Sequence, residues 1–190
     1  MEITSEKRVL VQQEKKGLPI RDVLLIGILL AAGAVLKFFV GSVINFGMKP
    51  NFIIAMYCLT ILLIKPRLLE AAIIGILAGA ICQFFPGQPY INFVSELTGA
   101  LAMCLLTKLP LEKCKIPVKT LCCTFFSTLV SGFTFIGVMY GLYYSGVDIT
   151  PTPLAIFMAI IGGTACINSI IVQILYIPLK LALRENRQNP

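Results

Sequence analysis

The chain has 190 residues, of which 57% are hydrophobic and only 13% charged, and its mean hydropathy is +0.89. A soluble domain of this length would need far more polar surface, so the composition excludes that class and predicts a membrane protein. Histidine is absent, which removes the commonest general base and the commonest metal ligand. The net charge of +7 does not indicate nucleic-acid binding, because the basic residues cluster beside apolar runs.

Six apolar segments predict a compact all-α bundle of six transmembrane helices in the cell membrane. They span residues 22–40, 50–64, 68–85, 91–107, 118–145 and 153–182. The second is shorter than the roughly 20 residues that a straight span needs, and Pro178 is expected to kink the sixth. Residues 1–21 are expected to form a cytoplasmic N-terminal segment, 22–183 the helical domain and 184–190 a cytoplasmic tail.

The distribution of basic residues predicts the orientation of the bundle. Fourteen of the sixteen Lys and Arg residues fall in segments that share one side when the helices alternate across the bilayer. The positive-inside rule therefore places both termini in the cytoplasm. Only Lys37 and Lys49 remain for the outer half, and we interpret Lys37, near the outer end of the first helix, as a snorkelling residue.

Small residues mark the first predicted helix. Gly27 and Ala31 are four positions apart, so they share a helix face that allows another helix to approach closely. The approaching helix can belong to this bundle or to a different protein.

The stretch "NFGMKPNF" (45–52) follows the first helix and carries Lys49 directly before Pro50. Proline suits the first turn of the next helix, which places the lysine near the outer surface. Its ammonium can either bind a substrate carboxylate or simply lie among the lipid headgroups.

The loop "FFPGQPYIN" (84–92) contains two prolines and a glycine, which make it stiff and turned. Phe85 and Tyr90 can cover a flat apolar ligand, and Gln88 and Asn92 offer donors and acceptors. Aromatic residues at a membrane interface are also ordinary belt residues, so the combination is more informative than any single one.

Glu96 lies inside the fourth apolar segment, on one helix face with Asn92, Gly99 and Met103. A carboxylate about 8 Å below the start of a helix is costly in lipid unless it is paired or hydrated. The functional interpretation is a binding-site acid that faces a cavity. The alternatives are a structural salt bridge to Lys49 or Lys37, or an acid favoured by the helix dipole.

The last two helices add Tyr140 and Asn168 as candidate ligand contacts. Tyr140 stands at an outer helix end, where belt tyrosines are common. Asn168 stands near mid-membrane, where an amide needs a partner that is either a neighbouring helix or a ligand.

Several classes of enzyme lack support in the sequence. The chain has no G-x-x-x-x-G-K-[ST] phosphate loop, no paired acids on one helix and no serine or cysteine beside a base. The seven cysteines lack metal-site spacing and are interpreted as packing residues. We therefore expect no enzymatic activity, no cofactor and no metal.

Three stretches carry a family resemblance: "GAVLKFFVGSVINFGMKPNF" (33–52), "ILLIKPRLLEAAIIGILAG" (61–79) and "FPGQPYIN" (85–92). With six helices in about 190 residues, the chain resembles the substrate-binding S component of an energy-coupling factor (ECF) transporter, of the TrpP tryptophan transporter type. The resemblance implies a ligand cavity near the outer side, a first helix that meets the transmembrane T subunit through Gly27 and Ala31, and two partner ABC-type ATPases that hydrolyse ATP.

Tryptophan is the ligand that this resemblance implies. Its carboxylate and ammonium would be bound by Lys49 and Glu96, and its indole needs flat walls and an acceptor for the N–H. The candidate walls are Phe46, Phe85, Tyr90 and Tyr140, and the candidate acceptor is Asn92 or Asn168. Asn51 and Gln88 are further candidate contacts. The alternative is a stand-alone secondary transporter for an aromatic amino acid or a vitamin.

Overall fold

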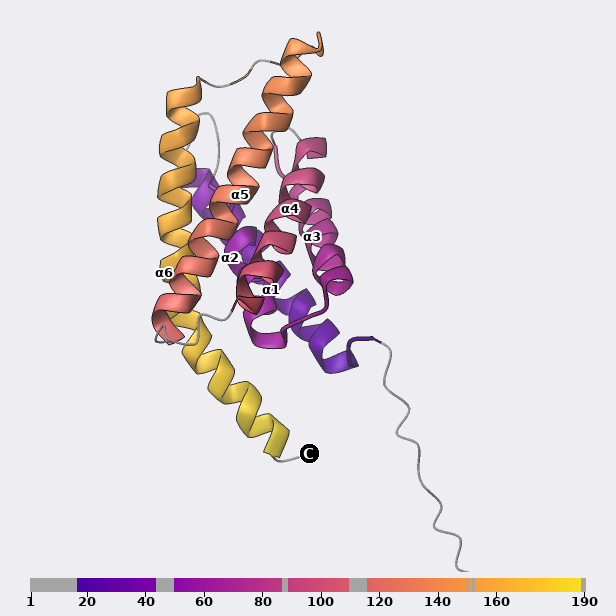
Figure 1. Cartoon of the computed structure of the whole chain (residues 1–190), viewed down its shortest axis with the longest axis vertical. Helices are drawn as coiled ribbons and strands as arrows, with labels where there is room; N and C mark the ends of the chain where they lie inside the picture. The colour runs from indigo at the N-terminus through magenta and orange to yellow at the C-terminus, as the bar shows by residue number, and fades with distance from the viewer. Residues whose placement is uncertain are drawn as a thin grey trace, which may run out of the picture.

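The computed structural model describes residues 17–43, 50–86, 89–109, 116–149, 151 and 153–188, with the side chains of 41–43, 89, 116–117 and 184–188 excepted. Within these residues the chain forms six α-helices and no β-strand, which confirms the all-α prediction. The helices are α1 (Ile20–Val43), α2 (Ile53–Ile64), α3 (Leu68–Cys82), α4 (Pro89–Lys108), α5 (Ile116–Tyr144) and α6 (Leu154–Gln188). In Figure 1, α3, α4, α5 and α6 lie side by side in that order.

Helix length separates the six helices into two groups. Four helices in the described part of the chain, α1, α4, α5 and α6, are long and apolar enough to cross a membrane. The other two, α2 and α3, have 12 and 15 residues. At 1.5 Å per residue they reach only about 18 and 22 Å, less than the hydrocarbon thickness of about 30 Å. Six complete spans, and the side on which the termini lie, therefore stay predictions.

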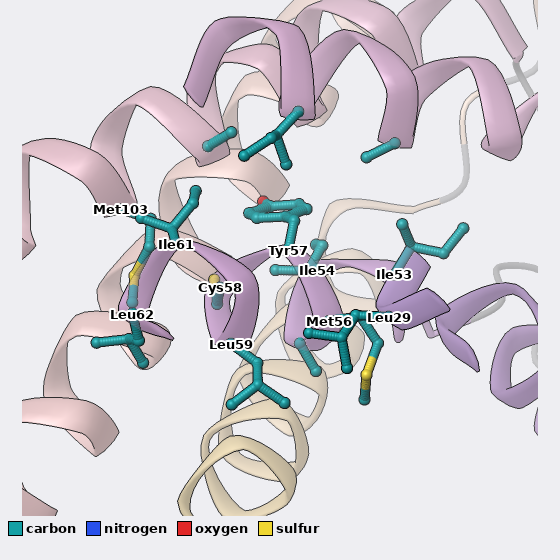
Figure 2. Close-up of a cluster of buried hydrophobic side chains, with 14 of the residues drawn as sticks. Leu29, Ile53, Ile54, Met56, Tyr57, Cys58, Leu59, Ile61, Leu62 and Met103 are labelled. Carbon is teal, nitrogen blue, oxygen red and sulfur yellow. The ribbon is translucent and has the colours of Figure 1, made fainter. Parts of the chain in front are cut away.

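Helix α2 forms the centre of the bundle. Every residue from Ile53 to Leu62 is buried, and α2 contacts all five other helices. Its sequence, IIAMYCLTILLI, has no polar face, and a helix that is apolar all round is stable only when it is surrounded. Figure 2 shows its side chains leaving the helix on several sides, toward Leu29 of α1 and Met103 of α4. Because α2 is buried from its first residue, the chain just before it also lies close to the interior of the bundle.

A pair of glycines on α3 brings that helix close to α4. A Cβ atom added at Gly75 would lie 2.8 Å from the backbone oxygen of Glu96, and one added at Gly79 would lie 2.9 Å from Cα of Phe93. The two glycines are four residues apart, in the G-x-x-x-G spacing that lets helix backbones approach in membranes. The close approach fixes the backbone of α4 at the position of Glu96.

The two described ends of the chain meet at one end of the molecule. The Arg21 guanidinium donates a hydrogen bond to the backbone oxygen of Leu183, at 2.9 Å. Helix α6 changes direction toward its C-terminal end, in the part that contains Pro178 (Figure 1). Proline removes a helical hydrogen bond and bends the helix, as the sequence predicts.

Candidate functional site

Glu96 is buried in the membrane-spanning helix α4, with only 1% of its surface exposed. One carboxylate oxygen, Oε1, accepts a hydrogen bond from the side-chain amide of Asn51. The other, Oε2, is buried and has no hydrogen-bond partner among the described residues. The side chains of Tyr57 and Ser131 also lie beside the carboxylate. Polar neighbours of this kind lower the cost of a carboxylate that is buried among apolar helices.

Asn51 lies two residues before α2 and connects several helices. Its Nδ2 also approaches the Cys82 Sγ of α3, at 3.7 Å, while its Oδ1 accepts from the backbone N–H of Ile53 at 3.3 Å. The backbone oxygen of Asn51 accepts a hydrogen bond from Asn168 Nδ2 of α6, at 3.2 Å. Asn51 is therefore held through its side-chain amide and through its backbone oxygen.

Lys37 of α1 is buried in the same region, with 7% of its surface exposed. Its Nζ donates to the Cys82 Sγ at 3.3 Å and lies 5.0 Å from the centroid of the Phe85 ring. The interpretation of Lys37 as a snorkelling residue is therefore wrong, because its ammonium points into the protein. Its side chain reaches Cys82 at the end of α3 instead of the headgroups.

These contacts define a set of polar residues that we call the charge cluster: Lys37, Asn51, Cys82, Glu96 and Asn168. The cluster draws on the C-terminal half of α1, the start of α2, the end of α3, the first half of α4 and the middle of α6. The Oδ1 of Asn168 is a second buried acceptor without a hydrogen-bond partner in the described part of the chain. The charge cluster thus contains two buried acceptor atoms without such a partner, and a buried lysine.

A second polar group, from α2, α4 and α5, lies beside the charge cluster. Tyr57 is completely buried, and its hydroxyl, red in Figure 2, lies directly against Gly99. Ser127 Oγ donates to the backbone oxygen of Gly99 at 2.9 Å and lies 3.4 Å from Cys58 Sγ. The Tyr57 hydroxyl itself is a further buried group without a hydrogen-bond partner among the described residues. Only a glycine at position 99 leaves room for it.

The structure brings some of the predicted site residues together. Asn51, Glu96 and Asn168 belong to the charge cluster, and Phe85 covers its lysine. The predicted inward face of α4 is confirmed for Glu96, Gly99 and Met103, all of which are buried.

Other predicted residues lie apart from the charge cluster or outside the described residues. Asn92 is half-buried one turn before Glu96, and Tyr90 is 82% exposed. Tyr140 packs against a separate apolar cluster that contains Ile136 and Phe157. Phe46, Lys49 and Gln88 lie outside the described residues, so their predicted roles stay predictions.

Sequence reasoning missed four contributors: Tyr57, Cys82, Gly75 and Gly79. The G-x-x-x-G spacing of the two glycines in an apolar run was a usable signal for close helix packing. Nothing in the sequence distinguishes Cys82 from the other cysteines in apolar runs or Tyr57 from a packing aromatic. Their roles depend on neighbours that are far away in sequence.

The chemistry of the charge cluster suits a small polar molecule. It combines a buried cation, a buried carboxylate with one unused oxygen and an unused amide oxygen, inside apolar helices. Opposite charges at such depth are stable when each meets a partner of opposite sign. A zwitterion supplies both partners at once.

Comparison with known proteins agrees with this chemistry. The family model "Tryptophan transporter TrpP" matches residues 19–184. A "Probable tryptophan transport protein" of Clostridium acetobutylicum is 25% identical over 171 residues, which cover 87% of this chain and 95% of that protein. No solved structure matches the chain. The family match confirms the resemblance to the TrpP type, and with the four long apolar helices it indicates a multi-pass membrane protein with a role in transport rather than catalysis. The chain therefore belongs to the TrpP tryptophan transporter family.

Proposed function

We propose that the chain is the substrate-binding S component of an ECF importer, which captures tryptophan on the outer side of the membrane for ATP-driven uptake by partner subunits. One observation carries the proposal: inside a chain of the TrpP family, Glu96 is buried with one oxygen bonded and the other without a partner in the described part of the chain. The bonded oxygen fixes the carboxylate, and the other is the atom proposed to bind the ligand.

Recognition of the ammonium group is the role proposed for Glu96. An alkylammonium has three N–H donors, and a buried carboxylate oxygen offers it a charge-assisted hydrogen bond. The carboxylate would then pair with a charge that the ligand brings, which removes the cost of its burial. Tryptophan, a zwitterion with an apolar body, supplies this charge without adding net charge to the bundle.

Recognition of the indole ring is proposed for the residues around the charge cluster. The unused Asn168 Oδ1 supports a role as acceptor of the indole N–H, and Phe85 supports one as an apolar wall. Phenylalanine has no N–H group to donate to this acceptor. The acceptor would stay unpaired, so the site would discriminate strongly against phenylalanine. Phe46, Gln88, Tyr90, Asn92 and Tyr140 remain proposed contacts of this ligand, as does Lys49.

Coupling to partner subunits is proposed for one face of α1. Gly27 and Ala31 are exposed there, and a Cβ atom at Gly27 would meet no other atom of the described chain within 4 Å. Such a face lets a helix of the T subunit approach closely. Two ABC-type ATPases would supply the energy, since this sequence contains no phosphate-binding loop of its own.

The absence of tryptophan from the sequence makes binding directly measurable. Indole fluorescence excited at the red edge of tyrosine absorption then comes from the ligand alone. We expect saturable binding of tryptophan to the purified protein in detergent, and a rise in its thermal stability with tryptophan concentration. Absence of any binding contradicts the proposed ligand.

Uptake measurements test the coupling. Cells that produce this chain together with T and ATPase subunits should accumulate radiolabelled tryptophan, and cells that produce the chain alone should not. ATPase subunits with an inactivated phosphate loop provide the matched control. Accumulation by the chain alone would contradict the S-component proposal and favour a stand-alone secondary transporter.

A further inference from the structure

Lys37 is a buried cation whose partners among the described residues are weak. An ammonium has three N–H donors, and here they meet a thiol at 3.3 Å and the face of an aromatic ring at 5.0 Å. Sulfur is a weak hydrogen-bond acceptor, and neither neighbour carries a full negative charge. A cation that is more than nine-tenths buried in apolar helices normally has an anionic partner.

Neutral side chains stand between Lys37 and Glu96. Cys82 Sγ contacts the Lys37 ammonium and the Asn51 amide, and the Asn51 amide in turn binds Glu96. The two charges are near enough to interact electrostatically. The hydrogen bonds that each makes among the described residues are nevertheless with neutral groups. A structural ion pair would bring the ammonium to the free Glu96 oxygen, which instead has no hydrogen-bond partner among the described residues.

We propose that Lys37 binds the carboxylate of the substrate while Glu96 binds its ammonium, and that Cys82 and Phe85 position the lysine for this contact. The inference rests on the proposed function, because it names the residue that reads one end of the same ligand. It gives Lys37 the role that the sequence suggested for Lys49. An α-amino acid carries one carboxylate and one ammonium group, so it can offer an opposite charge to Lys37 and to Glu96.

Ligand analogues and charge-removing variants test the assignment together. Tryptamine lacks the carboxylate, and indole-3-propionate lacks the ammonium. The wild-type protein should bind tryptophan about tenfold to a hundredfold more tightly than tryptamine, the range expected for a hydrogen bond between charged groups. In Lys37→Met this preference should fall to near unity, with the affinity for tryptamine retained.

Matched variants separate Lys37 from other effects. Lys37→Arg keeps the charge and should keep the preference for tryptophan over tryptamine. Lys108→Met removes an exposed lysine in the last turn of α4, which is not part of the charge cluster, and should leave the preference unchanged. In Glu96→Gln the preference of tryptophan over indole-3-propionate should disappear instead. Binding of tryptamine also shows that a variant is folded, and Lys37→Gln replaces Lys37→Met if the latter binds neither ligand.

The outcomes distinguish this inference from the proposed function. A wild-type protein that does not bind tryptophan overturns both. If the wild-type protein binds tryptophan, but Lys37→Met or Lys37→Gln keeps the preference for tryptophan over tryptamine, only the role of Lys37 is overturned. Loss of the preference in Lys49→Met but not in Lys37→Met assigns the carboxylate to Lys49 and likewise overturns the inference.

Discussion

Asn51 and Glu96, 45 positions apart in the sequence, are joined by a hydrogen bond from the amide of one to the carboxylate of the other. The bond connects the start of the central helix α2 to the first half of α4. The backbone oxygen of Asn51 also accepts a hydrogen bond from Asn168 of α6, so α2, α4 and α6 meet at this one residue. The carboxylate proposed to bind substrate is thus held by the same residue that anchors the core helix.

Replacement of Asn51 tests this arrangement. Asn51→Ala leaves Glu96 Oε1 without its donor, which should lower the free energy of unfolding by about 1–3 kcal/mol, the cost of an unpaired buried polar group. Tryptophan affinity should fall as well, since the carboxylate is no longer oriented. Thermal unfolding in detergent and ligand titration measure the two effects. Ser145→Ala, which removes an exposed hydroxyl on a local bond, is the control. Equal stability of the two variants would contradict the anchoring role.

The glycines of α3 provide a second prediction. Gly75→Ala and Gly79→Ala place a methyl group within 3 Å of the α4 backbone, so α3 and α4 must separate. We expect a loss of about 1–3 kcal/mol in the free energy of unfolding, typical of overpacking, together with weaker tryptophan binding. Gly137→Ala is the matched control, because a Cβ atom there meets nothing within 4 Å of the described chain. If all three variants unfold at the same temperature, α3 and α4 are not in close contact at Glu96.

A third prediction concerns Tyr57 and Gly99. Gly99→Ala forces its methyl group into the Tyr57 hydroxyl and should destabilise the protein. Tyr57→Phe removes that hydroxyl, which has no partner among the described residues, and should be neutral or stabilising by itself. The double variant should recover part of the stability that Gly99→Ala loses. Recovery is expected to be partial, because Ser131 Cβ would still lie 2.8 Å from the new methyl group. A strictly additive pair of effects would show that the two residues do not touch.

The small-residue face of α1 provides a fourth prediction. Gly27→Leu adds a side chain at an exposed position where a Cβ atom meets nothing within 4 Å of the described chain. Tryptophan binding by the purified variant should therefore match that of the wild type, while tryptophan uptake in cells with the partner subunits should fall severalfold. The control is Phe39→Leu, at an exposed position about a third of a turn away around α1. This variant should keep both tryptophan binding and tryptophan uptake. Loss of binding and uptake together in Gly27→Leu would indicate a structural role instead.

The sequence predicted the helices well and the site only in part. Hydropathy locates all six helices to within a few residues, because lipid-facing and core-facing segments are both apolar. Glu96 was identified because an acid inside an apolar run is costly and therefore informative. The inward position of Asn168 followed from the same reasoning for an amide.

The misjudged residues share a physical reason. Lys37 has a stem long enough to reach either the headgroups or the end of α3, and the sequence does not contain the position of Cys82 that decides between them. The partner of Asn51 is 45 positions away, so local pattern does not reveal it. The central place of α2 is set by tertiary packing, although its uniformly apolar sequence is consistent with burial on every side.

The most direct test is a tryptophan titration of the wild-type protein and of Glu96→Gln. Binding is measured by the indole fluorescence of the ligand, because the protein itself contains no tryptophan. The substitution keeps the shape of the side chain and removes its charge. The account predicts saturable binding by the wild type and an affinity at least about tenfold weaker in Glu96→Gln, the size of a lost charge-assisted contact. Equal affinity in a folded Glu96→Gln protein would contradict it.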